Sequence, residues 1–170
     1  GGRLIELLTE ADARVIATDV DPARLVHLEA KGVRSVPPEA ALTTECDVLS
    51  PCAIGGVINA RSIPHLRCRV IAGGANNQLE KASDAELLRE RGIIYAPDFV
   101  INAGGVLHGG GIEEQHWSPE VLAAKLAGIG DAISEILERA DHEGISADAA
   151  ARQIAVARIE AARPARALAP

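Results

Sequence analysis

Aromatic side chains are nearly absent from this sequence, whose 170 residues include one Trp, one Tyr and one Phe. Hydrophobic residues nevertheless make up 48% of the chain, which is enough to bury a core and indicates a single domain. Because Ala, Leu, Ile and Val supply most of these residues, the composition suits thin layers of helices packed on a sheet.

An excess of basic residues, paired cysteines and long apolar runs are also missing. The net charge of -7 leaves no basic surface for nucleic acid, which we exclude as a partner. No apolar run approaches the roughly 18 residues of a membrane span and no signal peptide is visible, so we expect a cytoplasmic protein without a membrane partner. Cys46, Cys52 and Cys68 lack paired spacing, which favours reduced core thiols over disulfides. The histidines do not cluster, so we expect no metal ion.

The first twenty residues are typical of a dinucleotide-binding unit that lacks its beginning. Gly1 leads directly into an amphipathic helical pattern, and an apolar run at residues 14–18 then ends at Asp19. In such a unit, the acid that holds the ribose hydroxyls follows the glycines of the phosphate-binding turn by about 20 residues. We therefore interpret Gly1 as the last glycine of that turn and Asp19 as the ribose ligand. NAD is the expected cofactor, since Asp19 would repel a 2′-phosphate and is followed by Val20 rather than by Arg.

Short apolar runs alternate with helical patterns through residue 96. The runs at residues 35–36, 47–51, 70–72 and 93–96 are continuous, which indicates parallel strands buried on both faces. We predict the α/β fold class, as a Rossmann-like doubly wound parallel sheet. Its first strand and most of its glycine-rich turn are expected to be absent from this chain.

Helical patterns occupy the sequence after Gly111. Ser118 predicts the start of a long helix and Gly144 its end, while Ser146 caps a second helix. Apolar residues at helical spacing define one face of the long helix: Leu122, Leu126, Ile129, Ile133 and Leu137. We expect residues 1–163 to form the dinucleotide-binding domain, with these helices included, and residues 164–170 to form a frayed tail.

Small residues and carboxamides follow three of the apolar runs, where open α/β sheets place ligand-binding groups. Cys52 and Ala53 close one run and would lie near the adenosine and ribose of a dinucleotide. Asn76 and Asn77 could bind the nicotinamide ribose and a substrate carboxylate, and Asn102 could reach the nicotinamide.

Each of these positions also has a purely structural interpretation. Asp19 could cap the turn before the next helix, although Asp21 is already placed for that role. Cys52 and Ala53 could form an ordinary tight turn. Asn77 could be a turn residue in the left-handed region, and Asn102 could cap a helix.

Residues 1–163 resemble the cofactor-binding domain of the glutamate, leucine, phenylalanine and valine dehydrogenases, and most closely the leucine and valine enzymes. The segments that carry the resemblance are residues 18–19, 46–56, 63–64, 70–73, 75–79, 95–98 and 100–106. The resemblance implies reversible oxidative deamination of a branched-chain L-amino acid to its 2-oxo acid and ammonia, with hydride passing to NAD. It also implies a homo-oligomer in the full-length form.

The resemblance assigns site residues one by one. Cofactor contacts are implied for Gly1, Asp19, Val20, Cys52, Ala53, Ala75, Asn77 and Asn102. Substrate contacts are implied for Asn77, Val106 and Gly109. Gly109 stands where the family has an apolar residue that narrows the pocket, which implies a wider side-chain pocket in this protein. The family's catalytic lysines lie in a domain outside this sequence, so we assign no catalytic residue and expect residues 1–170 alone to be inactive.

Other interpretations remain open on the residues alone. A hydroxy-acid dehydrogenase would need a catalytic His and Arg after the cofactor domain, and no such arrangement is evident. A non-catalytic nucleotide-binding module, or a decayed dehydrogenase fragment, is favoured by the missing lysines. It is disfavoured by the intact residues on the cofactor side.

Overall fold

The computed structural model describes residues 1–166, with side chains as far as Arg163. The strands are β1 (Ile16–Ala17), β2 (Arg34–Ser35), β3 (Val48–Leu49), β4 (Val70–Ile71) and β5 (Ile94–Tyr95). The α-helices are α1 (Gly2–Glu10), α2 (Pro22–Glu29), α3 (Asp84–Glu90), α4 (Asp98–Ile101), α5 (Gly104–Gly109), α6 (Pro119–Glu143) and α7 (Ala147–Arg166). The short helical turns are η1 (Pro38–Ala40), η2 (Ile63–His65) and the π-helical η3 (Gly110–Glu114). Of the predicted tail, residues 167–170 lie outside the described residues.

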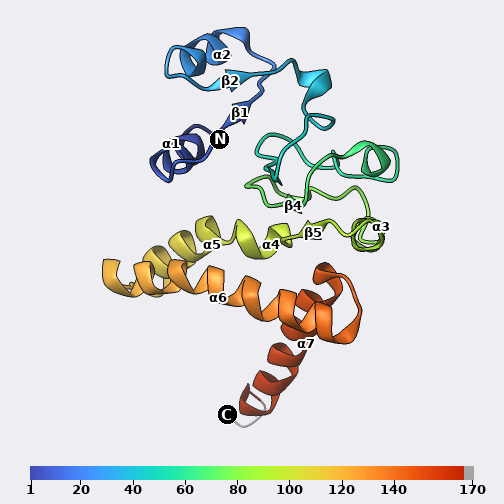
Figure 1. Ribbon diagram of the computed structural model, residues 1–170. Helices are drawn as coiled ribbons and strands as arrows, with labels where there is room; N and C mark the ends of the chain where they lie inside the picture. The colour runs from blue at the N-terminus through green and yellow to red at the C-terminus, as the bar shows by residue number, and fades with distance from the viewer. Residues whose placement is uncertain (167–170) are drawn as a thin grey trace.

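The strands are all parallel but form two separate sheets. β1 pairs with β2, while β3, β4 and β5 form a three-stranded sheet in that order. The N-terminal sheet and its helices α1 and α2 lie on one side of the molecule, and α6 and α7 lie on the other (Figure 1). The parallel α/β class is confirmed. Within the described residues β1 and β3 each pair on one side only, and they are the two strands that would flank the missing first strand.

Regular pairing between strands ends within or next to each apolar run. The last bond of each ladder is donated one residue beyond the strand: Val36 N–H to the Ala17 carbonyl (3.0 Å), Ala72 N–H to Leu49 (3.0 Å) and Ala96 N–H to Ile71 (2.9 Å). Pro37 and Pro97 come next in two of these segments and have no N–H to donate. The loops that follow the strands therefore begin abruptly at one edge of each sheet.

Several helices begin and end where the sequence predicts. The Asp21 carboxylate caps α2 by accepting a hydrogen bond from the Ala23 N–H at 2.9 Å. The Ser118 hydroxyl caps α6 in the same way, with the Val121 N–H at 3.4 Å. Gly144 ends α6 with a φ of 66°, a left-handed conformation that glycine adopts without strain.

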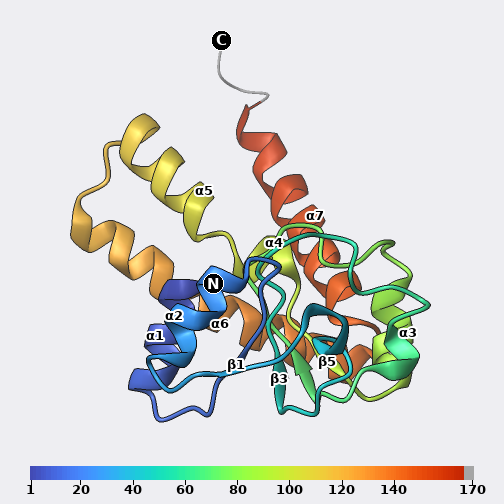
Figure 2. The same ribbon diagram turned by 90° about the horizontal axis from the view of Figure 1, so that it is seen from above.

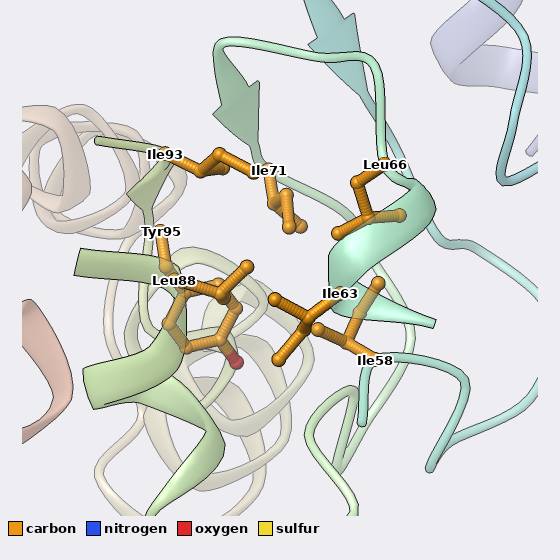
Figure 3. Packing of buried hydrophobic residues seen from close by; sticks show 7 residues of the cluster. All are labelled: Ile58, Ile63, Leu66, Ile71, Leu88, Ile93 and Tyr95. Atoms are coloured by element: carbon orange, nitrogen blue, oxygen red, sulfur yellow. The ribbon is translucent and has the colours of Figure 1, made fainter. Parts of the chain in front are cut away.

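The main hydrophobic core lies between the three-stranded sheet, α3 and η2 (Figure 3). Its buried members are Ile58, Ile63, Leu66, Ile71, Leu88, Ile93 and Tyr95. The two-stranded sheet has no comparable core, since Ala17 and Val33 are the buried residues of the segment from residue 1 to 47. Apolar burial is therefore concentrated under the loops that follow β3 and β4.

A second cluster joins the C-terminal helices to α4. Its buried residues are Ile136, Ala140, Ala150, Ala151 and Ile154. The apolar face expected on α6 is only partly buried, since the Leu126 residue is 38% exposed to solvent. The first half of α6 lies beside α5, away from the sheets, and only its second half reaches α7 and this cluster (Figure 2).

Candidate cofactor site

The loops after β1, β3 and β4 carry most of the predicted site residues. Parallel strands end at the same edge of a sheet, so the loops after β3 and β4 start side by side. The amino end of α1 reaches the same edge, because a Cβ atom built on Gly1 would lie 3.9 Å from Cβ of Cys52. The structure thus brings together Gly1, Cys52 and the segment from Ala75 to Asn77.

Asp19 presents a carboxylate immediately beyond β1. Its Oδ1 accepts a hydrogen bond from the Asp21 N–H at 3.0 Å, and its Oδ2 lies 3.4 Å from Nη1 of Arg24. The bond from Asp21, assisted by the charge of Arg24, lowers the pKa of Asp19 despite some desolvation. Oδ1 of Asp19 therefore caps the turn before α2, as the structural interpretation predicts. Oδ2 contacts the exposed guanidinium of Arg24. Val20, next to it, is 87% exposed.

Gly1 and Cys52 lie beside unsatisfied backbone donors. The first carbonyl–amide bond of α1 runs from the Ile5 N–H to the Gly1 carbonyl at 3.0 Å, so the N–H groups before Ile5 have no partner within the helix. Such a helix start attracts anions. Cys52 Sγ lies 3.5 Å from the Ser50 hydroxyl, and Ala53 is exposed. Gly1, Cys52 and Ala53 therefore surround exposed backbone N–H groups with small side chains.

The turn of residues 73–78 holds the predicted carboxamides. The Ala75 N–H donates to the Pro51 carbonyl at 2.9 Å, and the Gly56 N–H donates to the Asn77 carbonyl at 2.8 Å. Gly55 permits this approach, since a Cβ atom there would lie 2.6 Å from the Asn77 carbonyl oxygen. Asn77 has a φ of 51°, so its turn-forming interpretation is realised while its side chain stays exposed.

Asn102 joins this turn from a distant part of the chain. It follows the last residue of α4, and its Nδ2 donates to Oδ1 of Asn76 at 2.6 Å and to the Ala75 carbonyl at 3.3 Å. Asn102 is the C-cap residue of α4, in agreement with the capping interpretation. Its side chain, however, forms a hydrogen bond with Asn76, which lies 26 residues earlier in the sequence. Three carboxamides are thereby gathered at one place.

Val106 and Gly109 lie on α5, apart from this group. The sequence pattern did not predict a helix here, yet residues 104–109 are α-helical and residues 110–114 continue as a π-helical turn. The Trp117 ring packs on Gly111, where a Cβ atom would lie 2.2 Å from Cε3 of the ring. Val106 is 79% exposed, and no atom lies within 4 Å of a Cβ built on Gly109. Both face open space, with no contact to the carboxamides.

Four residues of this site were not predicted. Gly55 and Gly73 allow the loops after β3 and β4 to approach closely. Gln78 and Asp98 form buried hydrogen bonds that fix the turn of residues 73–78. Gly73, two residues after the end of β4, and the proline before Asp98 were visible in the sequence. Nothing local to either segment indicated that they would meet.

The remaining titratable residues form no second centre among residues 1–166. No three His, Cys, Asp or Glu side chains gather closely enough to hold a metal ion in this part of the chain. The three cysteines are unpaired and half-buried, and burial raises the pKa of the Cys46 and Cys68 thiols. Among the described helices, none is both long and apolar enough to cross a bilayer.

The fold and these strand-end loops define a parallel α/β domain of the Rossmann type, as found in NAD(P)-dependent oxidoreductases. More specifically, the chain belongs to the Glutamate/Leucine/Phenylalanine/Valine dehydrogenase family, whose sequence profile matches residues 4–167. The resemblance expected from the sequence is thus confirmed.

Named relatives within this family act on different amino acids. The chain is 38% identical to a leucine dehydrogenase of Thermoactinomyces intermedius over 96% of its own length, and 37% identical to a phenylalanine dehydrogenase of the same organism over 94%. The crystal structure of an L-tryptophan dehydrogenase from Nostoc punctiforme superposes with a TM-score of 0.87, at 35% identity and over 94% of this chain. The chain spans 44% of the two curated relatives and 49% of the tryptophan dehydrogenase chain.

Proposed function

We propose that this chain is the NAD-binding part of an amino-acid dehydrogenase that reversibly converts a branched-chain L-amino acid of the leucine or valine type to its 2-oxo acid and ammonia. The observation that carries the proposal is the convergence of Gly1, Cys52 and the Asn76–Asn102 pair at one edge of the strands. The 38% sequence identity with a leucine dehydrogenase, over 96% of this chain, supports the same function.

The groups at this edge fit a dinucleotide. The Asp19 carboxylate can accept hydrogen bonds from ribose hydroxyls, and the free N–H groups of α1 suit a pyrophosphate. Cys52 and Ala53 leave room for the adenosine side, while Ala75, Asn77 and Asn102 would hold the nicotinamide side. Bound NAD would supply the hydride acceptor.

The substrate residues in this proposal are Asn77, Val106 and Gly109. The Asn77 carboxamide would bind the substrate carboxylate region, and Val106 with Gly109 would line the side-chain pocket. Proton transfer is assigned to lysines of a domain outside this chain, so no catalytic residue is proposed here. The full-length form is proposed to be a cytoplasmic homo-oligomer.

Asp19→Ala in the full-length protein is expected to weaken NAD binding about ten- to a hundredfold, because it removes charge-assisted hydrogen bonds to the ribose. NADP binding is expected to improve, since Arg24 loses one of its two carboxylate partners and its Nη1 can face a 2′-phosphate. Dissociation constants measured by calorimetry for both cofactors check this expectation.

Asp21→Ala is the matched control for Asp19. It also removes an exposed carboxylate close to Arg24, at 3.5 Å from Nε, but it belongs to the cap of α2. NAD affinity is expected to stay within about twofold of wild type, within the scatter of an exposed polar site. If wild type and Asp19→Ala bind NAD and NADP with the same preference, Asp19 is not in the site. If NAD binds without any amino-acid turnover, the non-catalytic module becomes the better description.

Gly109→Val is expected to shift substrate preference from leucine and phenylalanine toward valine. Each methylene that no longer finds an apolar surface costs about 0.8 kcal/mol, or roughly fourfold in kcat/KM. Gly105→Val is the control, because a Cβ atom there also meets nothing within 4 Å and Gly105 lies in the same helix. An unchanged ranking of the three substrates in Gly109→Val would show that this position does not shape the pocket.

A further inference from the structure

The short helix α4 is attached at both ends to the turn that carries the carboxamides. Asp98, its first residue, is buried, and its Oδ2 accepts a hydrogen bond from the Gln78 N–H at 2.6 Å. Asn102, four residues later, donates to Oδ1 of Asn76 at 2.6 Å. Asp98 at the start of α4 and Asn102 just after its end therefore bind Gln78 and Asn76, two different residues of the same turn.

Gln78 makes that turn internally stiff. Its side chain is completely buried, and Nε2 donates to the Gly73 carbonyl at 2.7 Å and the Ala75 carbonyl at 3.0 Å. These two hydrogen bonds link the Gln78 side chain to the start of the turn. The backbone N–H of Gln78 donates a hydrogen bond to Asp98. The turn therefore has a fixed shape, and Asp98 fixes its place.

Asp98 is poorly explained as a contribution to stability alone. A buried acid is costly unless it is well bonded, and no Arg, Lys or His of residues 1–163 lies within 4.0 Å of its carboxyl oxygens. The nearby Arg152 is bound instead by Asp148, at 2.7 Å. The phenol oxygen of Tyr95 accepts the Asp98 N–H at 3.2 Å, and burial raises the pKa of Tyr95, which keeps this partner neutral.

We infer that Asp98 is a positioning residue for the candidate cofactor site: it sets where Asn76 and Asn77 lie relative to Asn102 and touches no ligand itself. The inference rests on the proposed NAD binding and deepens it, by assigning the placement of the nicotinamide end to a buried acid. The adenosine end, at Asp19 and the start of α1, has no contact with Asp98 and is independent of it.

Asp98→Ala in the full-length protein tests this division, with NAD and ADP as the two probes. ADP carries the adenosine and pyrophosphate but no nicotinamide. The variant is expected to bind NAD about tenfold more weakly, while its affinity for ADP changes less than about twofold. Asp98→Asn keeps an oxygen that can accept the Gln78 N–H, so it is expected to recover most of the loss, to about threefold.

Asp84→Ala is the matched control. Asp84 is also buried and its Oδ2 accepts a backbone N–H, from Lys81 at 2.8 Å, but it lies at the start of α3. This variant is expected to lose stability without changing the ratio of NAD to ADP affinity. An unchanged ratio in both Asp98 variants, or an equal loss for the two probes, overturns the inference. If Asp98→Ala does not fold, the threefold shift in Asp98→Asn decides.

Hydrogen exchange without ligand separates this inference from the proposed function. Backbone amides of residues 73–78 are expected to exchange about tenfold faster in Asp98→Ala than in wild type, and at the wild-type rate in Asp84→Ala. A wild-type protein that binds neither NAD nor ADP refutes the proposed function. The positioning of the turn by Asp98 then stands if exchange accelerates and falls if it does not.

Discussion

Gly73→Ala is expected to destabilise the full-length protein by roughly 3–5 kcal/mol and to abolish measurable NAD binding. A Cβ atom at Gly73 would lie 2.2 Å from the Pro51 carbonyl oxygen and 2.6 Å from the Pro51 nitrogen. These are backbone atoms, so the loops after β3 and β4 must move apart. The same Pro51 oxygen accepts the Ala75 N–H, and that bond would be lost. Thermal unfolding and calorimetry with NAD measure the two effects.

Gly74→Ala is a strict control for that experiment. Its Cβ atom would meet only Cys52 Sγ, at 3.8 Å, which is an ordinary contact. We expect its stability to stay within about 0.5 kcal/mol of wild type. If Gly73→Ala is equally well tolerated, the close approach of the two loops is not what holds the site together.

Residues 1–170 expressed alone are expected to bind NAD weakly and to produce no NADH from leucine. Among residues 1–166, β1 and β3 each pair on one side only, and Val48 of β3 is 53% exposed. Each backbone group left without a partner costs about 1–3 kcal/mol, against a total stability of about 5–15 kcal/mol for a domain. In the proposed function, further glycines for the pyrophosphate and lysines for proton transfer would also have to come from outside this segment.

Fusing a first strand and glycine turn before Gly1 is expected to restore cooperative unfolding and NAD binding, but not turnover. The strand of a leucine dehydrogenase relative is suitable for this purpose. Circular dichroism, calorimetry and leucine-dependent absorbance of NADH are the measurements for both proteins. Turnover by the short chain would contradict the assignment of catalysis to another domain. Tight NAD binding by the short chain would show that the two sheets suffice.

Local patterns predicted the parts of this fold that depend on local chemistry. Ser118 and Gly144 mark the ends of α6 because a hydroxyl cap and a left-handed residue act within one turn of the chain. The apolar runs predicted where the strands lie but not their ends, since β1, β3 and β4 stop before the runs do. The helical conformation of residues 104–114 was not predicted, because glycine disfavours helices and the Trp117 ring that packs there comes from outside the segment.

The candidate site divides along the same line. Asp19 and the carboxamides could be named from their places at the ends of apolar runs. The contact of Asp98 with Gln78 and that of Gly55 with Asn77 could not, because each depends on how two separate loops approach in space. The split of the sheet follows from strand pairing, which no single segment encodes.

The uneven distribution of the core has a thermodynamic consequence for ligand binding. Asp19 belongs to residues 1–47, whose only buried residues are Ala17 and Val33, whereas the carboxamide turn follows β4, whose Ile71 belongs to the main hydrophobic core. A region with few buried contacts opens at lower free energy than a well-packed one. In residues 1–170 expressed alone, the adenosine half of the proposed site would therefore be ordered by the cofactor itself, and part of the intrinsic binding free energy would be offset by that ordering. Affinity would then depend on residues of β1 and α2 that never touch the ligand.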